Sequence, residues 1–503
     1  MTHKPSAKKS SKTQDKKEDK KKNKVHPNPE QEGTKTKNLL LAVTGMSPAV
    51  VTETLYGIAQ RIPDECDKRL KNQWDELCIS DPNNYPEAGF YDWRESNKDD
   101  VEQQVIDELW PDEIRIITTS EGKKTLLNPD KWRGGEKNNI FKRVREVCEL
   151  VGPKNKDKDM PLDESHILVV PDANGKPVED AREIEDHEAL ANFITSTVRD
   201  FTSGDRWRIH ASIAGGRKTM TFYLGYAMSL FGRHFDCMSH VLVDKDFEGG
   251  DFFFPYQKDG DSYNVKVGKK DLDSRDATIK LTDIPFIRMR QNLPAILKEG
   301  VGSGDTLNYR TLVNLINLGD QPDNIRLRLT PKDGLVELFE GKPESADDQP
   351  VAKFTLQNPV YMAIYTAMAR VTKQSDKQRC RYVRTVKNGD DDSLLYLDVA
   401  QELARVAGMI HSTLKGKALF DELAGKITND NAMLAKLSCD ASIVGADLTD
   451  RVSEIRQKIE GSITEQLKYY LIPSSAFNEK GMTAARGKYY GLRLNPEQIE
   501  IIE

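Results

Sequence analysis

Short apolar runs alternate with helical patterns along residues 38–290. Five runs have the length and apolar composition of buried strands: 39–43, 114–118, 166–170, 207–213 and 240–243. Between them, apolar residues recur at helical spacing, most clearly over 140–151, 183–201 and 218–231. Strands that alternate with amphipathic helices are typical of an α/β fold. We therefore predict an α/β domain with a mainly parallel sheet over residues 38–290.

The alternation is interrupted by a polar segment at about residues 62–110. Its aromatic and sulfur-containing residues include Cys66, Trp74, Cys78 and Trp93. We interpret this segment as an insertion into the α/β domain, built from loops and short helices.

The pattern changes beyond residue 290, where longer helical stretches dominate. Helices are expected over 359–371, 394–420 and 449–471, followed by a strand over 489–494. We interpret 291–445 as a connecting, mostly helical region. A helix followed by a polar, Gly-containing loop and a strand is the outline of a winged-helix unit, which we predict for 446–503.

The first 37 residues have a different composition from the rest of the chain. They hold twelve lysines against five acidic residues and almost no apolar side chains, so we expect a disordered Lys-rich tail. The tail carries a charge of +7, which leaves −13 on the remainder of a chain whose net charge is −6. An acidic body is a poor general binder of long nucleic acid, because that affinity comes from neutralising phosphates. An anionic ligand therefore requires a local site.

Composition also narrows the chemistry that is expected. No apolar run approaches the ~18 residues of a membrane span, and no signal-peptide pattern is present. The six cysteines form no CxxC pair and the eight histidines form no HExxH pattern, so we expect no metal and no other cofactor. These features predict a cytoplasmic protein without membrane contact.

Two loops that follow predicted strands attract attention. The first is Thr44-Gly45-Met46-Ser47-Pro48, and the second runs from Ser212 through Gly215-Gly216-Arg217-Lys218-Thr219. Ligands of parallel α/β sheets bind in the crevice beyond the carboxyl ends of the strands. Both loops are expected at that edge.

The second loop has the residues that a phosphate ligand requires. Gly215 and Gly216 permit close backbone approach, and the predicted helix that begins near Lys218 offers unsatisfied N–H groups. Arg217 can contact phosphate with two parallel hydrogen bonds, while Lys218 supplies a compact cation. Additional hydroxyl donors are Thr44, Ser47 and Thr219. The short sequence GGRKT is neither a Walker A loop nor a GxGxxG fingerprint, and by itself it is also compatible with a tight turn bearing two solvated cations.

Several longer motifs occur in a fixed order. They are LLLAVTGMSPAVVTETLY at 39–56, SIAGGRKTMTFYLGYAMSLFGR at 212–233, SHVLV at 239–243 and IPFIRMR at 284–290. Together they resemble the CRISPR-associated ring nuclease family of type III CRISPR systems, whose sensor is a CARF (CRISPR-associated Rossmann fold) domain. The resemblance covers most of 38–290 and extends through VSEIRQKI at 452–459 and YGLRLNPEQI at 490–499.

The resemblance implies a homodimer with a Rossmann-like CARF core that encloses a cyclic oligoadenylate second messenger. The implied ligand-binding residues are Thr44, Gly45, Ser47, Pro48, Ser212, Gly215, Gly216, Arg217, Lys218 and Thr219. Two copies of Arg217 and Lys218 provide four cations, which match the four phosphates of cyclic tetra-adenylate.

The resemblance also implies a metal-independent phosphodiesterase that cleaves its own messenger. The ribose 2′-hydroxyl would attack the adjacent phosphorus and leave a 2′,3′-cyclic phosphate, so the protein mainly aligns groups and stabilises charge. Lys218 would stabilise the phosphoryl charge, Ser47 would orient the ribose or phosphate, and Arg217 would fix the ring. No histidine is obviously placed as a general base.

Other residues near the predicted strands have ordinary structural explanations beside functional ones. His210 lies on the strand before the second loop, where we expect a packed strand residue rather than a catalyst. Asp172 and Asp180 flank a turn with Arg182 nearby. Turn formation and ligand contact both remain open for Asp180 and Arg182.

Two alternatives place the function in the C-terminal region. Arg405 and His411 have the spacing of a HEPN ribonuclease motif, but Val406 stands where a polar residue is usual. The other alternative is a messenger-activated regulator without ring cleavage, in which the winged-helix unit contacts RNA, DNA or a protein. The near-neutral charge of 447–503 does not favour strong DNA binding.

Overall fold

The computed structural model describes most of the chain between residues 36 and 502. The described residues are 36–81, 83–85, 89–128, 139–154, 156, 160–248, 252–254, 262–267, 270–298, 309–345, 348–373, 401–405, 452–473 and 491–502. The chain divides into two units, Met1–Lys35 and Thr36–Glu503, of which only the second contains described residues. The expected Lys-rich tail therefore lies almost entirely outside them. In the part that is described, no helix has the length and apolarity needed to span a membrane.

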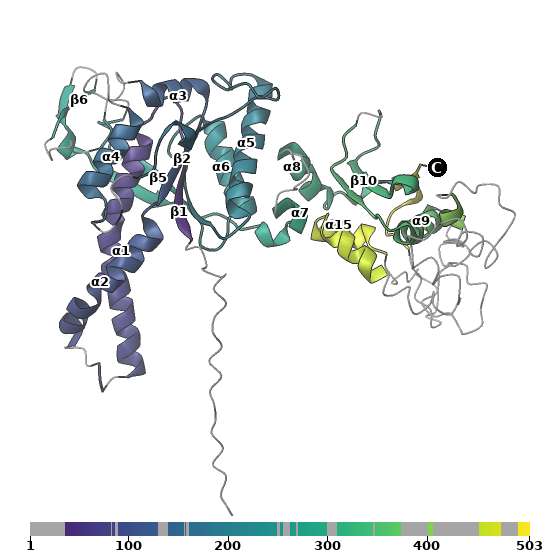
Figure 1. Cartoon of the computed structure of the whole chain (residues 1–503), viewed down its shortest axis with the longest axis horizontal. Coiled ribbons are helices and arrows are strands. Elements are labelled where there is room, and N and C mark those ends of the chain that lie inside the picture. Colours follow the sequence, from purple (N-terminus) through teal and green to yellow (C-terminus); the bar gives the residue numbers. More distant parts are fainter. Residues whose placement is uncertain are drawn as a thin grey trace, which may run out of the picture. The chain divides into compact units, whose positions relative to one another are not determined.

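A six-stranded sheet forms the centre of the N-terminal half (Figure 1). Its strand order is β3-β2-β1-β4-β5-β8. The first five strands pair in parallel and β8 is antiparallel to β5. Their bounds are β1 (Lys37–Val43), β2 (Glu113–Thr118), β3 (Ile167–Val169), β4 (Trp207–Ser212), β5 (Cys237–Val243) and β8 (Ile279–Asp283). The prediction of an α/β fold with a mainly parallel sheet is confirmed.

Strand β1 is buried on both faces, which explains its uninterrupted apolar sequence. Leu39 and Leu41 belong to one core with residues of α5 (Ile184–Thr202) and α6 (Lys218–Phe231). Leu40 and Ala42 belong to a second core with residues of α1 (Val50–Ser80) and α4 (Ile140–Val151). Because side chains alternate along a strand, the two cores lie on opposite faces of the sheet.

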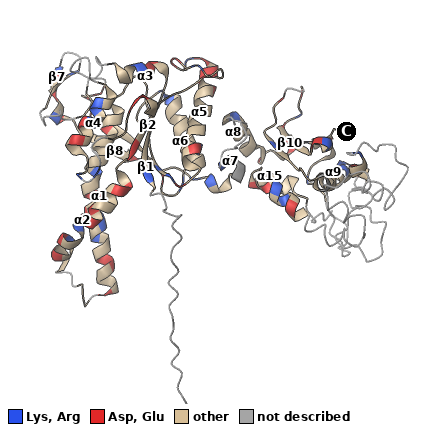
Figure 2. Ribbon diagram, viewed as in Figure 1, with Lys and Arg blue, Asp and Glu red and all other residues tan. Residues whose placement is uncertain are grey.

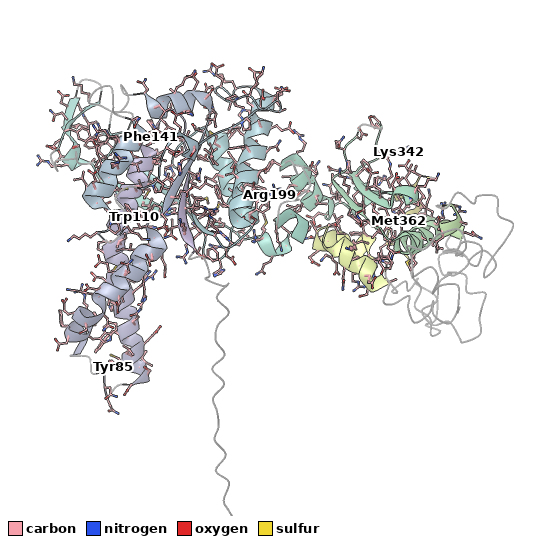
Figure 3. All side chains as sticks on the ribbon, viewed as in Figure 1. Tyr85, Trp110, Phe141, Arg199, Lys342 and Met362 are labelled. Carbon is pink, nitrogen blue, oxygen red and sulfur yellow. The ribbon has the colours of Figure 1, made fainter. Side chains whose placement is uncertain are left out.

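The expectation of loops and short helices over 62–110 is wrong. This segment instead belongs to α1, which has 31 residues, and to α2 (Phe90–Leu109), and the two helices pack side by side (Figure 1). Trp74 of α1 packs against Trp93 of α2, with ring centroids 5.5 Å apart, and against Tyr85 at the far end of the hairpin (Figure 3). A narrow apolar seam in an otherwise charged segment is enough to pair two helices.

The expectation of a mostly helical region over 291–445 is also wrong for the described residues 325–355. They form three strands, β9 (Ile325–Thr330), β10 (Leu335–Glu340) and β11 (Ala352–Thr355), in a sheet of order β11-β10-β9-β12. Residues 325–330 alternate buried and half-buried side chains, the period of a strand with one covered face. Helices α8 (Tyr309–Leu318) and α9 (Pro359–Lys373) flank this sheet in the sequence.

The C-terminal segment contributes a strand to the same sheet. Strand β12 (Ile499–Ile501) pairs in parallel with β9, with Ile499 opposite Leu327.

The strand expected over 489–494 is absent from its described part, 491–494. The helix expected over 449–471 is divided at Gly461 into 452–460 and α15 (Glu465–Leu471). Of the helix expected over 394–420, only 401–405 is described, and it is helical. The remaining described elements are α3 (Ser120–Leu127), α7 (Ala295–Lys298), β6 (Asn264–Val267) and β7 (Lys270–Asp273).

The first turns of α1 are buried on every side, and they include one acidic residue. Residues 50–58 are all buried, among them Glu53, and this burial raises the pKa of the Glu53 carboxyl to about 8. Between its unfolded pKa of about 4.5 and pH 8, the folded protein therefore binds more protons than the unfolded chain. The contribution of Glu53 to stability falls as the pH rises through this window.

We predict that Glu53→Gln raises the thermal midpoint at pH 8 relative to the wild type and that the difference shrinks towards pH 5. The Gln amide does not ionise between pH 5 and 8, so the substitution removes this part of the pH dependence of stability. Thermal unfolding followed by circular dichroism between pH 5 and 8 measures the effect. Glu76→Gln, at an exposed position of the same helix, is the control. A constant difference across the pH range would contradict the prediction.

Candidate phosphate-binding site at the strand ends

The two loops singled out in the sequence lie side by side in the structure. They follow β1 and β4, which are neighbours in the sheet, with Ala42 opposite Ser212. The chain continues from β1 to β2 on one side, whereas β4 lies on the other side of β1. Such a switch point opens a crevice at the carboxyl ends of the strands. The predicted juxtaposition of the loops is therefore present.

Glycines allow the loops to approach each other. A Cβ on Gly45 would lie 3.4 Å from Gly216 Cα, and one on Gly215 would lie 2.9 Å from the carbonyl oxygen of Val43. Gly216 has a φ of 85°, a conformation that L side chains rarely adopt. The backbone of the second loop is thus packed onto the end of β1, and this packing requires glycine at 215 and favours it at 216.

A third loop, which the sequence analysis did not single out, completes this edge. It follows β2, and Thr118 Oγ1 donates a hydrogen bond to the carbonyl oxygen of Thr44 (2.7 Å). A Cβ on Gly122, in the first turn of α3, would lie 2.0 Å from Thr118 Oγ1 and 3.4 Å from Gly45 Cα. The available signal was a glycine within a few residues of the end of a predicted strand, as in the two loops already chosen.

The predicted hydroxyl residues fall into two groups. Thr44 is buried and donates to the carbonyl oxygen of Ser47 (3.0 Å), while Ser212 is buried with its Oγ 3.1 Å from Thr54 Oγ1. Their side chains hold the loops in shape. Ser47 is exposed, and Thr219 Oγ1 is buried without a hydrogen-bond partner among the described residues. The other predicted residue of the first loop, Pro48, is buried.

Arg217 already has a carboxylate partner. Its Nη2 lies 2.6 Å from Asp180 Oδ2 and its Nε donates to Asp180 Oδ1 (3.2 Å), while Arg182 Nε lies 2.9 Å from the same carboxylate. The hydrogen bond from Arg217 and then that from Arg182 lower the pKa of Asp180. The Arg217 and Asp180 side chains are 41% and 25% exposed, and solvent-accessible ion pairs contribute only ~0–1 kcal/mol. A phosphate can therefore displace or share this pair at small cost.

A strained residue fixes the position of Asp180. Ala181 has a φ of 51°, the one described non-glycine residue with a positive φ, and its side chain is buried in the core beneath α5 and α6. An L residue in this conformation costs on the order of 1–3 kcal/mol and is found where the surroundings enforce it. Asp180 and Arg182, the residues on either side of Ala181, both take part in the ion pairs described above.

Lys218 differs from Arg217 in having no counter-ion in the described part of the chain. It is exposed and begins α6, and no carboxylate of the described residues lies within 4.0 Å of its Nζ. No side chain caps the N-terminus of α6, so the positive end of the helix adds to the charge of Lys218. An anion bound here would meet a cation and open backbone donors together.

The neighbouring cavity is acidic. It has a volume of about 580 Å³ and is lined by Met46, Glu121, Glu179, Asp180, Arg182, Glu183 and Asp186. Asp186 accepts hydrogen bonds from the backbone N–H groups of Arg182 and Glu183, which places it at the N-terminus of α5. Five carboxylates on this side confine the positive potential to Arg217, Lys218 and the start of α6.

The remaining sequence-predicted residues lie apart from this constellation. His210 Nε2 lies 2.7 Å from Ser239 Oγ, and desolvation lowers the pKa of the imidazole to about 4, as suits a packed strand residue. Asp172 accepts hydrogen bonds from the N–H groups of Asn174 and Lys176 and so closes a turn. Arg405 forms an ion pair with Glu402, and His411 lies outside the described residues. In the described part of the chain, no group of three or more His, Cys, Asp or Glu residues could hold a metal ion.

The fold and loops define an α/β protein with a candidate anion-binding crevice at the switch point of its sheet. Residues 107–309 match the model of a family described as CRISPR-associated protein NE0113. The match extends from α2 into α8 and contains the loop with Arg217 and Lys218, but not the loop after β1. No curated protein matches the chain. The similarity connects the chain with CRISPR-associated proteins and supports a role in CRISPR defence.

We predict that Asp180→Asn strengthens phosphate-ligand binding about two- to fivefold, because it releases Arg217 from a pair worth no more than ~1 kcal/mol. Cyclic tetra-adenylate binding measured by calorimetry at pH 7.5 tests this. Glu185→Gln, an exposed acidic residue of α5, controls for the change in net charge. A weaker affinity in Asp180→Asn alone would show instead that Asp180 positions Arg217 for the ligand.

Proposed function

We propose that this protein binds a cyclic oligoadenylate second messenger of type III CRISPR defence at the ends of β1 and β4. The observation that carries the proposal is the exposed Lys218 at the uncapped start of α6, with no carboxylate of the described residues within 4.0 Å. It lies beside Arg217, in the loop that packs on the loop after β1. The family match adds the CRISPR context, and the motif resemblance adds the CARF class of sensor. Cyclic oligoadenylate supplies the phosphates that such a site requires.

The proposed binding unit is a homodimer whose two sites face each other. Phe222 lies one turn after Lys218 on α6, is 59% exposed, and stacks on Tyr226 with ring centroids 6.0 Å apart. An exposed aromatic ring that stacks on a half-buried one beside a ligand loop suits an interface with a second copy. Two copies of Arg217 and Lys218 then supply four cations, which favours cyclic tetra-adenylate over larger rings.

Cleavage of the bound ring is the proposed reaction. The 2′-oxygen of a ribose attacks the adjacent phosphorus, the bond to the 5′-oxygen breaks, and a 2′,3′-cyclic phosphate and a 5′-hydroxyl result, with the 2′-proton passing to the leaving oxygen through solvent. Lys218 would stabilise the charge on the phosphoryl oxygens and Ser47 would orient the ribose or phosphate. His210 is hydrogen-bonded to Ser239, and burial lowers the pKa of its imidazole to about 4. It is therefore not assigned a role as the general base. Turnover without a general base is expected to be slow.

We predict that Lys218→Ala weakens binding of cyclic tetra-adenylate by tenfold or more. One charge-assisted phosphate contact is worth roughly 1.5–3 kcal/mol, and a dimer loses two of them. Isothermal titration calorimetry with the full chain measures the affinity. Lys245→Ala removes an exposed lysine elsewhere in the same domain and serves as the matched control. Equal affinity in the two variants would remove Lys218 from the site.

We predict metal-independent cleavage that requires the ribose 2′-hydroxyl. Radiolabelled cyclic tetra-adenylate should be cut in EDTA, whereas the 2′-O-methyl analogue should bind but persist. Ser47→Ala should slow cleavage less than Lys218→Ala, because it removes an orienting hydroxyl and leaves the cation, whose loss costs on the order of a hundredfold in rate.

Two other outcomes would replace the ring-nuclease mechanism. An intact messenger after long incubation at protein excess, together with uncut RNA, would identify a regulator that binds without cleavage. Messenger-stimulated cutting of linear RNA that is lost in Arg405→Ala or His411→Ala would place the reaction in the C-terminal region.

A further inference from the structure

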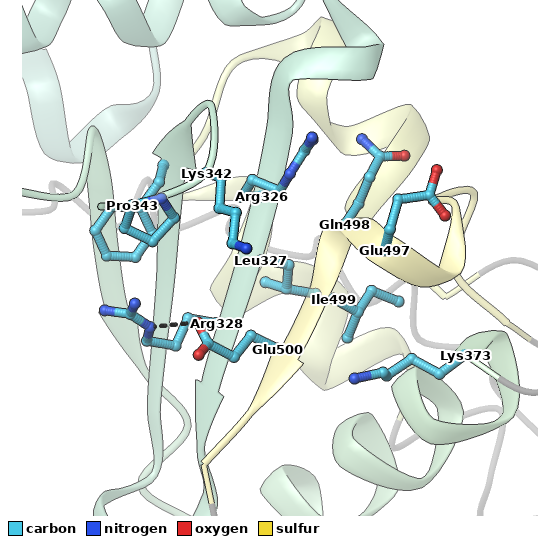
Figure 4. A pocket seen from close by; sticks show the side chains of 11 residues that line it. Arg326, Leu327, Arg328, Lys342, Pro343, Lys373, Glu497, Gln498, Ile499 and Glu500 are labelled. Atoms are coloured by element: carbon cyan, nitrogen blue, oxygen red, sulfur yellow. Dashed lines mark hydrogen bonds and ion pairs between the residues drawn. The ribbon is translucent and has the colours of Figure 1, made fainter. Parts of the chain in front are cut away.

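A second group of cations lines a cavity in the four-stranded C-terminal sheet. The cavity has a volume of about 230 Å³ and lies where the beginnings of β9 and β12 meet the turn after β10 and the end of α9 (Figure 4). Its charged lining residues are Arg326, Arg328, Lys342, Lys373, Glu497 and Glu500. Four positive side chains and two negative ones therefore share a small space.

The carboxylates do not neutralise this group. Arg328 Nε forms an ion pair with Glu500 Oε2 at 2.8 Å, which accounts for one charge of each sign. Arg326, Lys342 and Lys373 remain, and within the described ranges no carboxylate lies within 4.0 Å of their charged nitrogens. Among the described lining residues, Glu497 is the one carboxylate left to oppose these three cations.

Neutral groups also contact the polar side chains of the cavity. Arg326 Nη1 donates to the carbonyl oxygens of Asp323 (2.6 Å) and Ile325 (2.9 Å), so its charge is oriented without being cancelled. The Arg328 guanidinium lies 4.7 Å from the centroid of the Phe339 ring. Gln498 Nε2 is fixed by the carbonyl oxygen of Ile325 (2.8 Å). Donors that are already held in position lose less conformational entropy when an anion binds, so binding costs less free energy.

We propose that this cavity binds a phosphate group carried by an RNA or a nucleotide. Arginine forks and lysine ammonium groups are the side chains that recognise phosphate, and a net positive cavity is relieved when one enters. Its volume equals that of roughly eight liquid waters at ~30 Å³ each, enough for a phosphate and part of a ribose. The base would remain outside, so recognition would not depend on sequence.

This site explains how the C-terminal region can be locally basic although 447–503 is nearly neutral. Its cations come from 326–373, and only the acidic residues come from the C-terminal segment. The parallel pairing of β12 with β9 brings the two sets together.

Fluorescence anisotropy with a labelled single-stranded RNA ten-mer carrying a 5′-phosphate tests the proposal. The full chain would carry Lys218→Ala, so that the strand-end site does not contribute. Adding Lys342→Gln and Lys373→Gln, both exposed positions, should weaken binding at least tenfold. The plot of log affinity against log salt should become shallower by about one. The matched control is the pair Lys332→Gln and Lys245→Gln, which removes two exposed lysines outside the cavity.

The source of the phosphate is distinguished by two further probes. If a 5′-hydroxyl RNA binds as tightly as the 5′-phosphorylated one, the cavity takes a backbone phosphate. If inorganic phosphate displaces the RNA with an affinity equal to that of the RNA, the cavity recognises the free anion. Equal affinity of the cavity variant and the control variant, or no binding of any of the three probes, would overturn the proposal.

Discussion

The parallel pairing of β1 with β4 is the constraint on which the candidate site depends. The register that places Ala42 opposite Ser212 makes both following loops leave the sheet at the same level. The backbones of Gly45 and Gly216 then lie close together, and Gly216, with a φ of 85°, has a conformation that L side chains rarely adopt. Because Leu39 and Leu41 are enclosed by one core and Leu40 by the other, β1 cannot slip without exposing apolar surface.

Local periodicity was sufficient to predict the elements that carry the site. The expected helices over 140–151 and 218–231 agree with the bounds of α4 and α6, since each has an unbroken apolar face and a glycine directly after it. The ion pair between Asp180 and Arg217 was beyond such reasoning. It joins residues 37 positions apart, and it depends on a backbone angle at Ala181 that no side-chain pattern signals.

The larger errors had a different physical origin. The segment 62–110 holds fourteen acidic and five basic residues, and its composition concealed the seam along which α1 and α2 pair (Figure 2). The pairing of β12 with β9 could not be predicted because it joins segments more than 150 residues apart, with Ile499 opposite Leu327. The alternation over 325–330, in contrast, is a local strand signal that the helical interpretation of 291–445 did not take into account.

Net charge and local charge have separate consequences in this protein. The residues after the Lys-rich tail carry −13, and −9 of this lies within 62–110, on and between α1 and α2. At physiological salt, screening limits the electrostatic influence of exposed charges to about 8–10 Å. The acidic segment 62–110 therefore need not weaken a phosphate site outside that range. What decides anion binding is the first few ångströms around Lys218 and Arg217, where Asp180 is the competing anion. Because this ion pair is worth only ~0–1 kcal/mol, Asp180 weakens the binding of an anion to Arg217 by no more than about fivefold. A ligand with several phosphates, such as the one proposed above, would offset that loss by engaging Arg217 and Lys218 in the same event.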